Sequence, residues 1–368
     1  MPTMSIDYGQ LQAFFVAERL PGIQNLWLKS EPTINMLYSV AMAGSLNGAS
    51  EIKDYAKAAK NPTNPNFNKR FLGGTLFFES ASEYLAVGGT VNGSGAQAIS
   101  NNPQDQHVVA RWRFNVKSTP LAIATDQWLA SQNAGGKVAQ TKKLEGLIAA
   151  KVGSALKTQI QALSTDLFST NTDEETGIIS LKALTGVSAS DTTTYGGISR
   201  STISQWLSNY ATYSSADSID PLSSYYLPIF LGGKIDTLCD NGSMLEDLVI
   251  IMGSTVFSNY RKCVMGVPGS ASTTPPNSGQ FNIDGGRNFP YAGLYLNKVP
   301  VIRDQRCGAT DIFILDTATS IMVGLANALF KLSDWQLSEG STQEFARLTT
   351  ISNVVGTSPR NDYYIAAA

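Results

Sequence analysis

The sequence predicts an α+β protein in which one long helix and an extended β-hairpin reach out from a unit of alternating strands and helices. Three observations support this class. An apolar repeat with helical spacing runs from residue 142 to 169, strand-rich stretches flank a glycine-rich tract within residues 61–118, and strands alternate with helices from 177 to 325. The chain has 368 residues, 43% of them apolar, which is enough for a large core in two or three domains.

The chain carries unusually little charge. Asp, Glu, Lys and Arg make up 15% of it, and the net charge is −2. This balance excludes a nucleic-acid binder that relies on a strong basic surplus. It also indicates that partner proteins cover much of the surface, because an isolated subunit needs charge to stay soluble. A surface that is merely polar, rich in Ser, Thr, Asn and Gln, is the alternative.

Residues 1–60 mix short helical patches with glycine and proline breaks, and we expect an arm that lies on a neighbouring molecule. Residues 61–118 then turn to strand patterns, which form the expected β-hairpin loop. Its predicted strands are Arg70–Glu79, Glu83–Val87 and His107–Lys117. An isolated hairpin is marginal in water, so we expect this one to lie on another subunit as well.

The next region, residues 119–176, is predicted to hold a helical patch at Leu121–Ser131 and the long helix at 142–169. No proline interrupts the long helix, whose length would be about 40 Å at 1.5 Å per residue. Its apolar residues recur at steps of three and four and form one stripe. The members of this stripe are Leu144, Leu147, Ile148, Val152, Leu156, Ile160, Leu163 and Leu167.

Residues 177–328 read as a compact α/β unit, followed by C-terminal strands in 329–368. We expect a helix at Arg200–Tyr213, one from Asp220 toward Cys239 with a kink at Pro228, and one capped by Ser254. Residues 266–293 read as a long loop. The predicted strands are Asp247–Met252, Val299–Arg303, Asp311–Leu315, Ser320–Gly324 and, in the tail, Glu344–Ser352.

The residues that could carry chemistry are few, and we expect no enzyme, no cofactor and no metal site. His107 is the single histidine, and nothing in the sequence places a third group beside it. The cysteines at 239, 263 and 307 are widely spaced and fit reduced thiols better than a zinc site. The acidic run at 173–175 reads as a solvated stretch. No signal peptide and no apolar stretch of membrane-spanning length is expected, so we predict no contact with a membrane.

Basic residues alternate with aromatic residues along the hairpin. Arg111 and Arg113 flank Trp112, and Lys69 with Arg70 opens the hairpin region. On an arm that reaches over a neighbour, these charges would meet carboxylates of the adjacent subunit, and exposed strand charges also protect sheet edges. The alternative is a stripe that binds single-stranded nucleic acid. We predict Lys69, Arg70, Arg111, Trp112 and Arg113 as contacts between subunits.

The order of arm, long hairpin, long helix, α/β unit and C-terminal strands resembles the major capsid proteins of tailed double-stranded DNA phages, of the Hong Kong 97 type. The resemblance covers about residues 60–365 and lies in the order of four loose motifs. These motifs are the helix at 151–168 followed by the apolar run at 177–184, the Gly-Gly-Ile turn at 195–202 with Trp206, the strand and helix at 247–261, and the strand pair at 296–316.

This resemblance implies the Hong Kong 97-like capsid fold, with a peripheral domain that contains the spine helix and the C-terminal strands of 329–368, and an axial domain near the capsomer centres. It implies a virion protein, assembled in the host cytoplasm, whose copies form pentamers and hexamers of an icosahedral shell around double-stranded DNA. Expected partners are other copies, a portal, possible scaffold or decoration proteins, and DNA held without sequence specificity. An encapsulin-like compartment shell is the first alternative, and a cytosolic α/β enzyme is the remote one.

Overall fold

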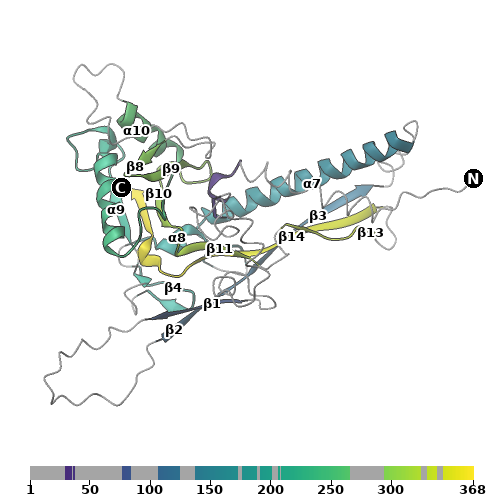
Figure 1. Ribbon diagram of the computed structural model, residues 1–368, viewed down its shortest axis with the longest axis horizontal. Coiled ribbons are helices and arrows are strands. Elements are labelled where there is room, and N and C mark those ends of the chain that lie inside the picture. The colour runs from purple at the N-terminus through teal and green to yellow at the C-terminus, as the bar shows by residue number, and fades with distance from the viewer. Residues whose placement is uncertain are drawn as a thin grey trace, which may run out of the picture.

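The computed structural model has a body of helices and sheets from which a long helix and a β-ribbon extend in different directions (Figure 1). The elements are labelled as in Figure 1. The residues that the structure describes are 30–34, 36–37, 77–83, 107–124, 137–172, 176–188, 191–200, 206–207, 209–265, 294–324, 330–337 and 343–368.

The long helix α7 (Lys137–Leu167) confirms the main prediction, although it begins before residue 142 and ends before residue 169. Its stripe packs on the strands β3 (Asn115–Ala124) and β14 (Gln343–Gly356). Polar contacts fix the register of this packing: the Gln159 side-chain amide donates to the Lys117 carbonyl at 2.9 Å, and Lys117 pairs with Asp166. The buried members of the stripe are Ile148, Val152, Leu156, Ile160, Leu163 and Leu167.

Strand β14 is the centre of the sheet under α7. It pairs antiparallel with β3 from Gln343 opposite Ala124 to Ser352 opposite Asn115, and with three shorter strands. This pairing overturns part of the predicted helical patch at Leu121–Ser131, because Leu121–Ala124 belongs to β3; residues 125–131 lie outside the described part. The shorter strands are β11 (Ser320–Gly324), β12 (Lys331–Leu332) and β13 (Gln336–Leu337).

A second sheet of six strands forms the middle of the body, in the order β6-β15-β10-β7-β9-β8. Every residue of β7 is buried, and alternate residues serve opposite faces, as expected for a strand covered on both sides. The strands are β6 (Tyr210–Tyr213), β7 (Leu248–Met252), β8 (Tyr295–Leu296), β9 (Val299–Arg303), β10 (Ile312–Asp316) and β15 (Tyr363–Ala367).

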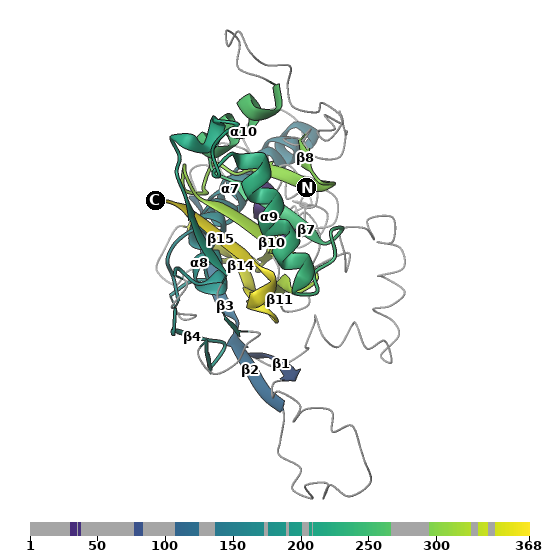
Figure 2. The same cartoon turned by 90° about the vertical axis from the view of Figure 1, so that its left-hand side faces the viewer.

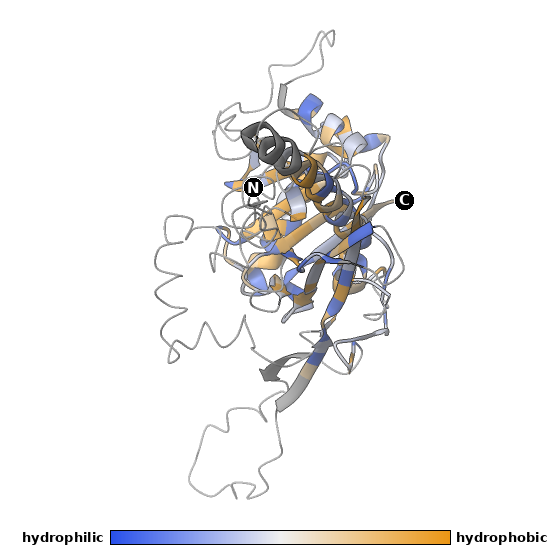
Figure 3. Ribbon diagram, turned by 90° about the vertical axis from the view of Figure 1, so that its right-hand side faces the viewer, coloured by the Kyte–Doolittle hydropathy of each residue, from blue (hydrophilic) through white to orange (hydrophobic). Residues whose placement is uncertain are grey.

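Helices α9 (Leu227–Asp240) and α10 (Ser254–Met265) share a core with one face of this sheet, and α9 lies in front of the strands in Figure 2. The opposite face joins the core of α7, where the rings of Phe168 and Phe313 lie 5.9 Å apart. Figure 3 shows the central strands mostly in hydrophobic colours and the long strands of the other sheet in alternating ones. The six-stranded sheet therefore separates two cores.

Short elements connect these parts. Helix α8 (Leu181–Thr185) follows α7, with the Ser180 side chain accepting from the Ala183 N–H as its N-cap. A small hairpin of β4 (Thr194–Tyr195) and β5 (Ile198–Ser199) follows α8. The 3₁₀ helices η4 (Asp217–Ile219) and η5 (Pro359–Asn361) precede α9 and β15.

The predicted hairpin is present as the antiparallel ribbon of β1 (Phe77–Glu83) and β2 (His107–Arg113). Its register places Phe78 opposite Trp112 and Glu79 opposite Arg111. The residues predicted as strand at 70–76 and 84–87 lie outside the described part, as do the glycine-rich tract between the strands and the loop at 266–293.

Two predicted helices are wrong in part. Residues 210–213 of the predicted helix Arg200–Tyr213 form β6, because their pairing with β15 outweighs the helical spacing of their side chains. The helix predicted from Asp220 begins at Leu227, and Asp220 instead accepts from the Leu222 N–H in a turn. Pro228 lies in the first turn of α9 and starts the helix rather than kinking it, since a missing N–H is harmless there.

Two segments pack elsewhere than predicted. Strand β15, within the C-terminal region expected beside the long helix, joins the six-stranded sheet instead. Residues 30–34 and 36–37, within the arm expected to lie on a neighbour, pack on their own chain, where Ile34, Met36 and Leu37 are buried. The rest of the arm lies outside the described residues, and the domain boundaries stay a prediction.

The packing of α7 yields a direct test. We expect Leu156→Ala to lower the free energy of unfolding by about 2–5 kcal/mol, because it opens a cavity under a fully buried side chain. Ser154→Ala on the exposed face of the same helix is the control, with an expected change within about 0.5 kcal/mol. Urea unfolding measures both; equal effects would contradict the observed orientation of α7.

Candidate functional site

The root of the β1–β2 ribbon, where β2 joins the body, is the first candidate site, because it sets the direction in which the ribbon points. Trp112 of β2 is fully buried there against two aromatic rings. Its ring lies 5.8 Å from Tyr195 in an edge-on arrangement and 6.4 Å from Trp206 in a stacked one. These three rings form an aromatic cluster that fixes the end of the ribbon.

The turn between β4 and β5 brings backbone into direct contact with this cluster. The Arg111 N–H donates to the Gly196 carbonyl at 3.0 Å. Gly196 has a φ of +59°, and a Cβ atom built on it would lie 2.8 Å from the Trp112 ring. Both the left-handed backbone and the close approach therefore require glycine at this position. Gly197, with φ +78°, requires it for the backbone alone, since nothing lies within 4 Å of an added Cβ.

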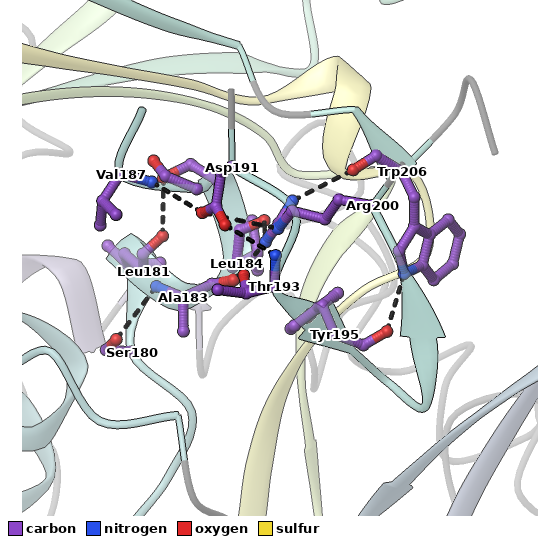
Figure 4. Close-up of polar contacts among 12 residues, drawn as sticks. Ser180, Leu181, Ala183, Leu184, Val187, Asp191, Thr193, Tyr195, Arg200 and Trp206 are labelled. Carbon is purple, nitrogen blue, oxygen red and sulfur yellow. Dashed lines mark hydrogen bonds and ion pairs between the residues drawn. The ribbon is translucent and has the colours of Figure 1, made fainter. Parts of the chain in front are cut away.

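Arg200 lies fully buried beside the aromatic cluster and ties three chain segments together (Figure 4). Its guanidinium donates to the Leu184 carbonyl at 2.9 Å, to the Trp206 carbonyl at 3.2 Å and to the Ala183 carbonyl. The same group lies 5.4 Å from the centre of the Tyr195 ring. The two terminal nitrogens of this planar group thus bond the end of α8 and the Trp206 segment, and the group also contacts the Tyr195 ring of the β4–β5 hairpin.

Asp191 is the countercharge of Arg200, with 3.9 Å between its Oδ2 and the Arg200 Nε. Its oxygens accept from the Thr193 N–H at 2.9 Å and from the Val187 N–H at 3.1 Å. Burial alone would raise the pKa of Asp191, but these donors and Arg200 bring that pKa below its ordinary value. Burial lowers the pKa of Arg200, and Asp191 opposes that effect. The pair stays charged and holds its loop in place.

Further bonds attach the aromatic cluster to β14. The Tyr195 hydroxyl oxygen accepts from the Gly356 N–H at 2.7 Å, and the Trp206 Nε1–H donates to the Tyr195 carbonyl at 2.8 Å. The Asn353 side chain donates to the Arg113 carbonyl at 2.7 Å and accepts from the Ile179 N–H at 2.9 Å. Burial raises the pKa of Tyr195, so its hydroxyl stays protonated. These contacts hold the ribbon root in one geometry.

The outward face of α9 is the second candidate site. Ile229 on this helix is 67% exposed, and Leu222 just before it is 95% exposed. Gly232 and Gly233 follow Ile229, although glycine in a helix interior costs about 1 kcal/mol relative to alanine. Packing within the chain does not explain Gly233, since nothing lies within 4 Å of an added Cβ. The first part of this face, around Ile229 and Gly233, is apolar and open to close approach by another molecule, whereas Asp236 and Asp240 are exposed further along the helix.

The sequence-predicted contact residues divide into three groups. Lys69 and Arg70 lie outside the described part. Arg111 and Arg113 are exposed on β2, so their role between subunits stays a prediction. Trp112 is a correction: its side chain faces inward from β2 and packs in the core of its own chain, so it is withdrawn as a contact.

Sequence reasoning missed Arg200 and Asp191. The Gly-Gly turn before Arg200 and the tryptophan after it are signals of a tightly packed segment, but the partners of Arg200 come from separate segments.

His107 is the first residue of β2, opposite Glu83. Within the described residues, no cluster of three His, Cys, Asp or Glu side chains is arranged to hold a metal, and no helix there has the length and hydrophobicity to cross a membrane.

The glycine pair gives a matched test of the ribbon root. We expect Gly196→Ala to destabilise the protein by more than about 2 kcal/mol, because it combines backbone strain with a collision against Trp112. Gly197→Ala meets open space and should cost only the backbone strain of about 1–2 kcal/mol. Chemical unfolding gives the stability, and near-ultraviolet circular dichroism reports the tryptophan packing. A spectrum that changes equally in both variants would refute the close contact.

No protein-family model and no curated protein matches the sequence. Solved structures do match: the capsid asymmetric unit of cyanophage A-1(L) has a TM-score of 0.53 and 15% identity, over 81% of this chain and 90% of that chain. The capsid of an empty GTA particle has a TM-score of 0.50 and 11% identity, over 81% and 94%. The SrpI encapsulin of Synechococcus elongatus PCC 7942 scores 0.43 at 10% identity, over 80% and 83%, which is too low for any inference. This mixed chain of helices and sheets therefore has the fold of phage capsid proteins, the Hong Kong 97-like fold that the sequence predicts.

Proposed function

We propose that this chain is the major capsid protein of a phage, and that its copies assemble as pentamers and hexamers into an icosahedral shell around double-stranded DNA. The observation that carries the proposal is the capsid fold, with a TM-score of 0.53 to a phage capsid subunit over most of both chains. In this function the chain is a structural protein of the virion, assembled in the host cytoplasm, with a portal and possibly scaffold or decoration proteins as further partners.

The ribbon supports a role in assembly. Strand β1 pairs with β2 alone among the described strands, and a lone two-stranded ribbon is marginal in water. Its root nevertheless is fixed by the Trp112 cluster and the Arg200 network. A rigid base combined with a ribbon of little stability of its own fits an arm that gains its stability on a neighbouring copy. Arg111 and Arg113, exposed on this arm, are the proposed contacts with that copy.

The outward face of α9 supports the same role, and its charges favour a second copy of this chain as the occupant. Asp236 and Asp240 are exposed toward the end of α9, whereas Arg261 and Lys262 are exposed on α10. Opposite charges on two different helices of one subunit favour a head-to-tail contact between copies, which closes into a ring when the rotation between copies is right. Pentamers and hexamers are such rings.

Contact with the packaged DNA would be weak and independent of sequence. The net charge of −2 provides no basic surplus, so few phosphates would be neutralised by each subunit. The chain would enclose DNA mainly by forming a closed container. Binding to free DNA should therefore be undetectable at physiological salt, while the shell retains DNA that was packaged.

Electron microscopy of the purified chain tests the proposal. Closed particles with icosahedral symmetry are the expected result, and nuclease-protected double-stranded DNA in particles from infected cells would complete it. Particles that enclose a cargo protein and no DNA would replace the proposal by a compartment shell. A monodisperse monomer at micromolar concentration would reject both.

The two open helix glycines give a prediction about assembly. We expect Gly233→Ala to raise the free energy of unfolding of the isolated subunit by up to about 1 kcal/mol, yet to lower the yield of closed particles, because its methyl group occupies the space for the second copy. Gly146→Ala on α7 is the matched control, since it is also exposed with nothing within 4 Å. Thermal unfolding and particle counts measure the two effects. Normal particle yield in Gly233→Ala would remove α9 from the interface.

A further inference from the structure

A short stretch of the N-terminal region lies between the long helix α7 and the six-stranded sheet. We call residues 30–34 and 36–37 the clasp segment; residues 32–34 and 36–37 are helical. In Figure 1 it is the short purple piece beside the end of α7 that meets the body. It touches both the long helix and the connection that follows β9, so it bridges two parts of the fold that are distant in sequence.

Glu31 makes the polar bridge. Its carboxylate accepts from the Ser164 hydroxyl of α7 at 3.0 Å and lies 3.7 Å from the Arg306 Nε, beyond β9. Glu31 is nearly buried, whereas the Arg306 side chain is 38% exposed. One carboxylate therefore joins α7 to the β9–β10 connection of the six-stranded sheet, and water reaches Arg306, one of its two partners.

Asp304 anchors the segment from the other side. It is fully buried, and its Oδ2 accepts from the Thr33 N–H at 3.3 Å. Its own N–H donates to the Met252 carbonyl at the end of β7, and its Oδ1 accepts from the Arg306 N–H at 2.8 Å. The clasp segment is thus bonded to a residue that the sheet itself holds rigidly.

Apolar contacts complete the bridge. Ile34, Met36 and Leu37 belong to the same core as the stripe of α7 and as Ile302 of β9. They fill space between helix and sheet, so removing the segment would expose apolar surface on both sides.

From this arrangement we infer that the clasp segment opens and closes independently of the rest of the fold, and that in its closed position it locks α7 to the six-stranded sheet through Glu31. Two features favour independent opening: the clasp segment pairs with none of the described strands, and its ion-pair partner Arg306 is partly solvated. Its use in assembly rests on the proposed function: an open clasp lets the angle between α7 and the sheet differ between pentamers and hexamers.

The charge of Glu31 sets the strength of the lock. Burial, and the nearby charge of Asp304, raise the pKa of Glu31 above 4.5, while Ser164 and Arg306 act in the opposite direction. The closed clasp therefore binds a proton more tightly than the unfolded chain does. The contribution of Glu31 to the stability of the closed clasp is therefore fully present below pH 4.5 and is lost as pH rises through the raised pKa. The facing titratable groups are Asp304 and Arg306 on the β9–β10 connection; Ser164 on α7 does not titrate.

Hydrogen exchange measured by mass spectrometry on the unassembled full chain tests the clasp. We expect Glu31→Ala to speed exchange of the 30–37 peptide about tenfold, because it removes the bonds to Ser164 and Arg306, and to leave β7 and β10 unchanged. Glu31→Gln keeps an acceptor for Ser164, so it should restore the protection of the clasp peptide. After correction for intrinsic exchange rates, the protection in this variant should not vary with pH as it does in the wild type. Asp217→Ala, which removes an exposed carboxylate from η4, is the control.

Equal acceleration of the clasp peptide and of β7 in Glu31→Ala would show that the segment unfolds only with the whole subunit, and the inference would fail. Unchanged exchange in the clasp peptide would equally overturn the role of Glu31.

For assembly, we expect Glu31→Ala to broaden the size distribution of particles. If wild type and variant form equally uniform particles, the clasp has no part in assembly; if the wild type forms none, the proposed function fails while the exchange result stands.

Discussion

The burial of β7 and β10 on both faces is the constraint on which the rest of this structure depends. All five residues of each strand are buried, and alternate residues face the core of α9 and α10 on one side and the core of α7 on the other. Burying one large apolar side chain contributes about 1.5–3 kcal/mol, so these two strands organise both cores at once. The outer helices and the clasp segment pack against this sheet, and the core under α7 extends to its opposite face.

Polar groups then give direction to what apolar burial holds together. Apolar contact alone would let the β1–β2 ribbon rotate on its base, because it has no preferred geometry. Hydrogen bonds to backbone atoms remove that freedom. They are made by the side chains of Arg200, Asp191 and Asn353 to the backbone of Leu184, Val187 and Arg113. Burying a charge this deeply seldom adds net stability, and its contribution here is the unique orientation of the ribbon.

The sequence was a good guide where one face or both faces of an element are apolar. The stripe of α7, the buried run of β7 and the alternation in β14 each carry their own period, and each was predicted. The spacing of apolar residues predicts a helix for Leu121–Ala124 and for Tyr210–Tyr213. Both segments form strands instead, because they pair with β14 and β15, which lie far away in the sequence. The candidate sites were harder still. The contacts of Arg200 and Glu31 join separate segments, and the exposure of Ile229 appears only once α9 has packed.

The position of β15 has a consequence for the time at which the subunit becomes complete. This strand is the sole link between β6 and β10 in the sheet, and it comes from residues 363–367. During synthesis the edges of β6 and β10 that pair with β15 stay open until those residues have left the ribosome, although the other described strands come earlier in the chain. A chain cut short before this strand retains both edges unpaired, so the six-stranded sheet is completed only in subunits that have been translated through β15.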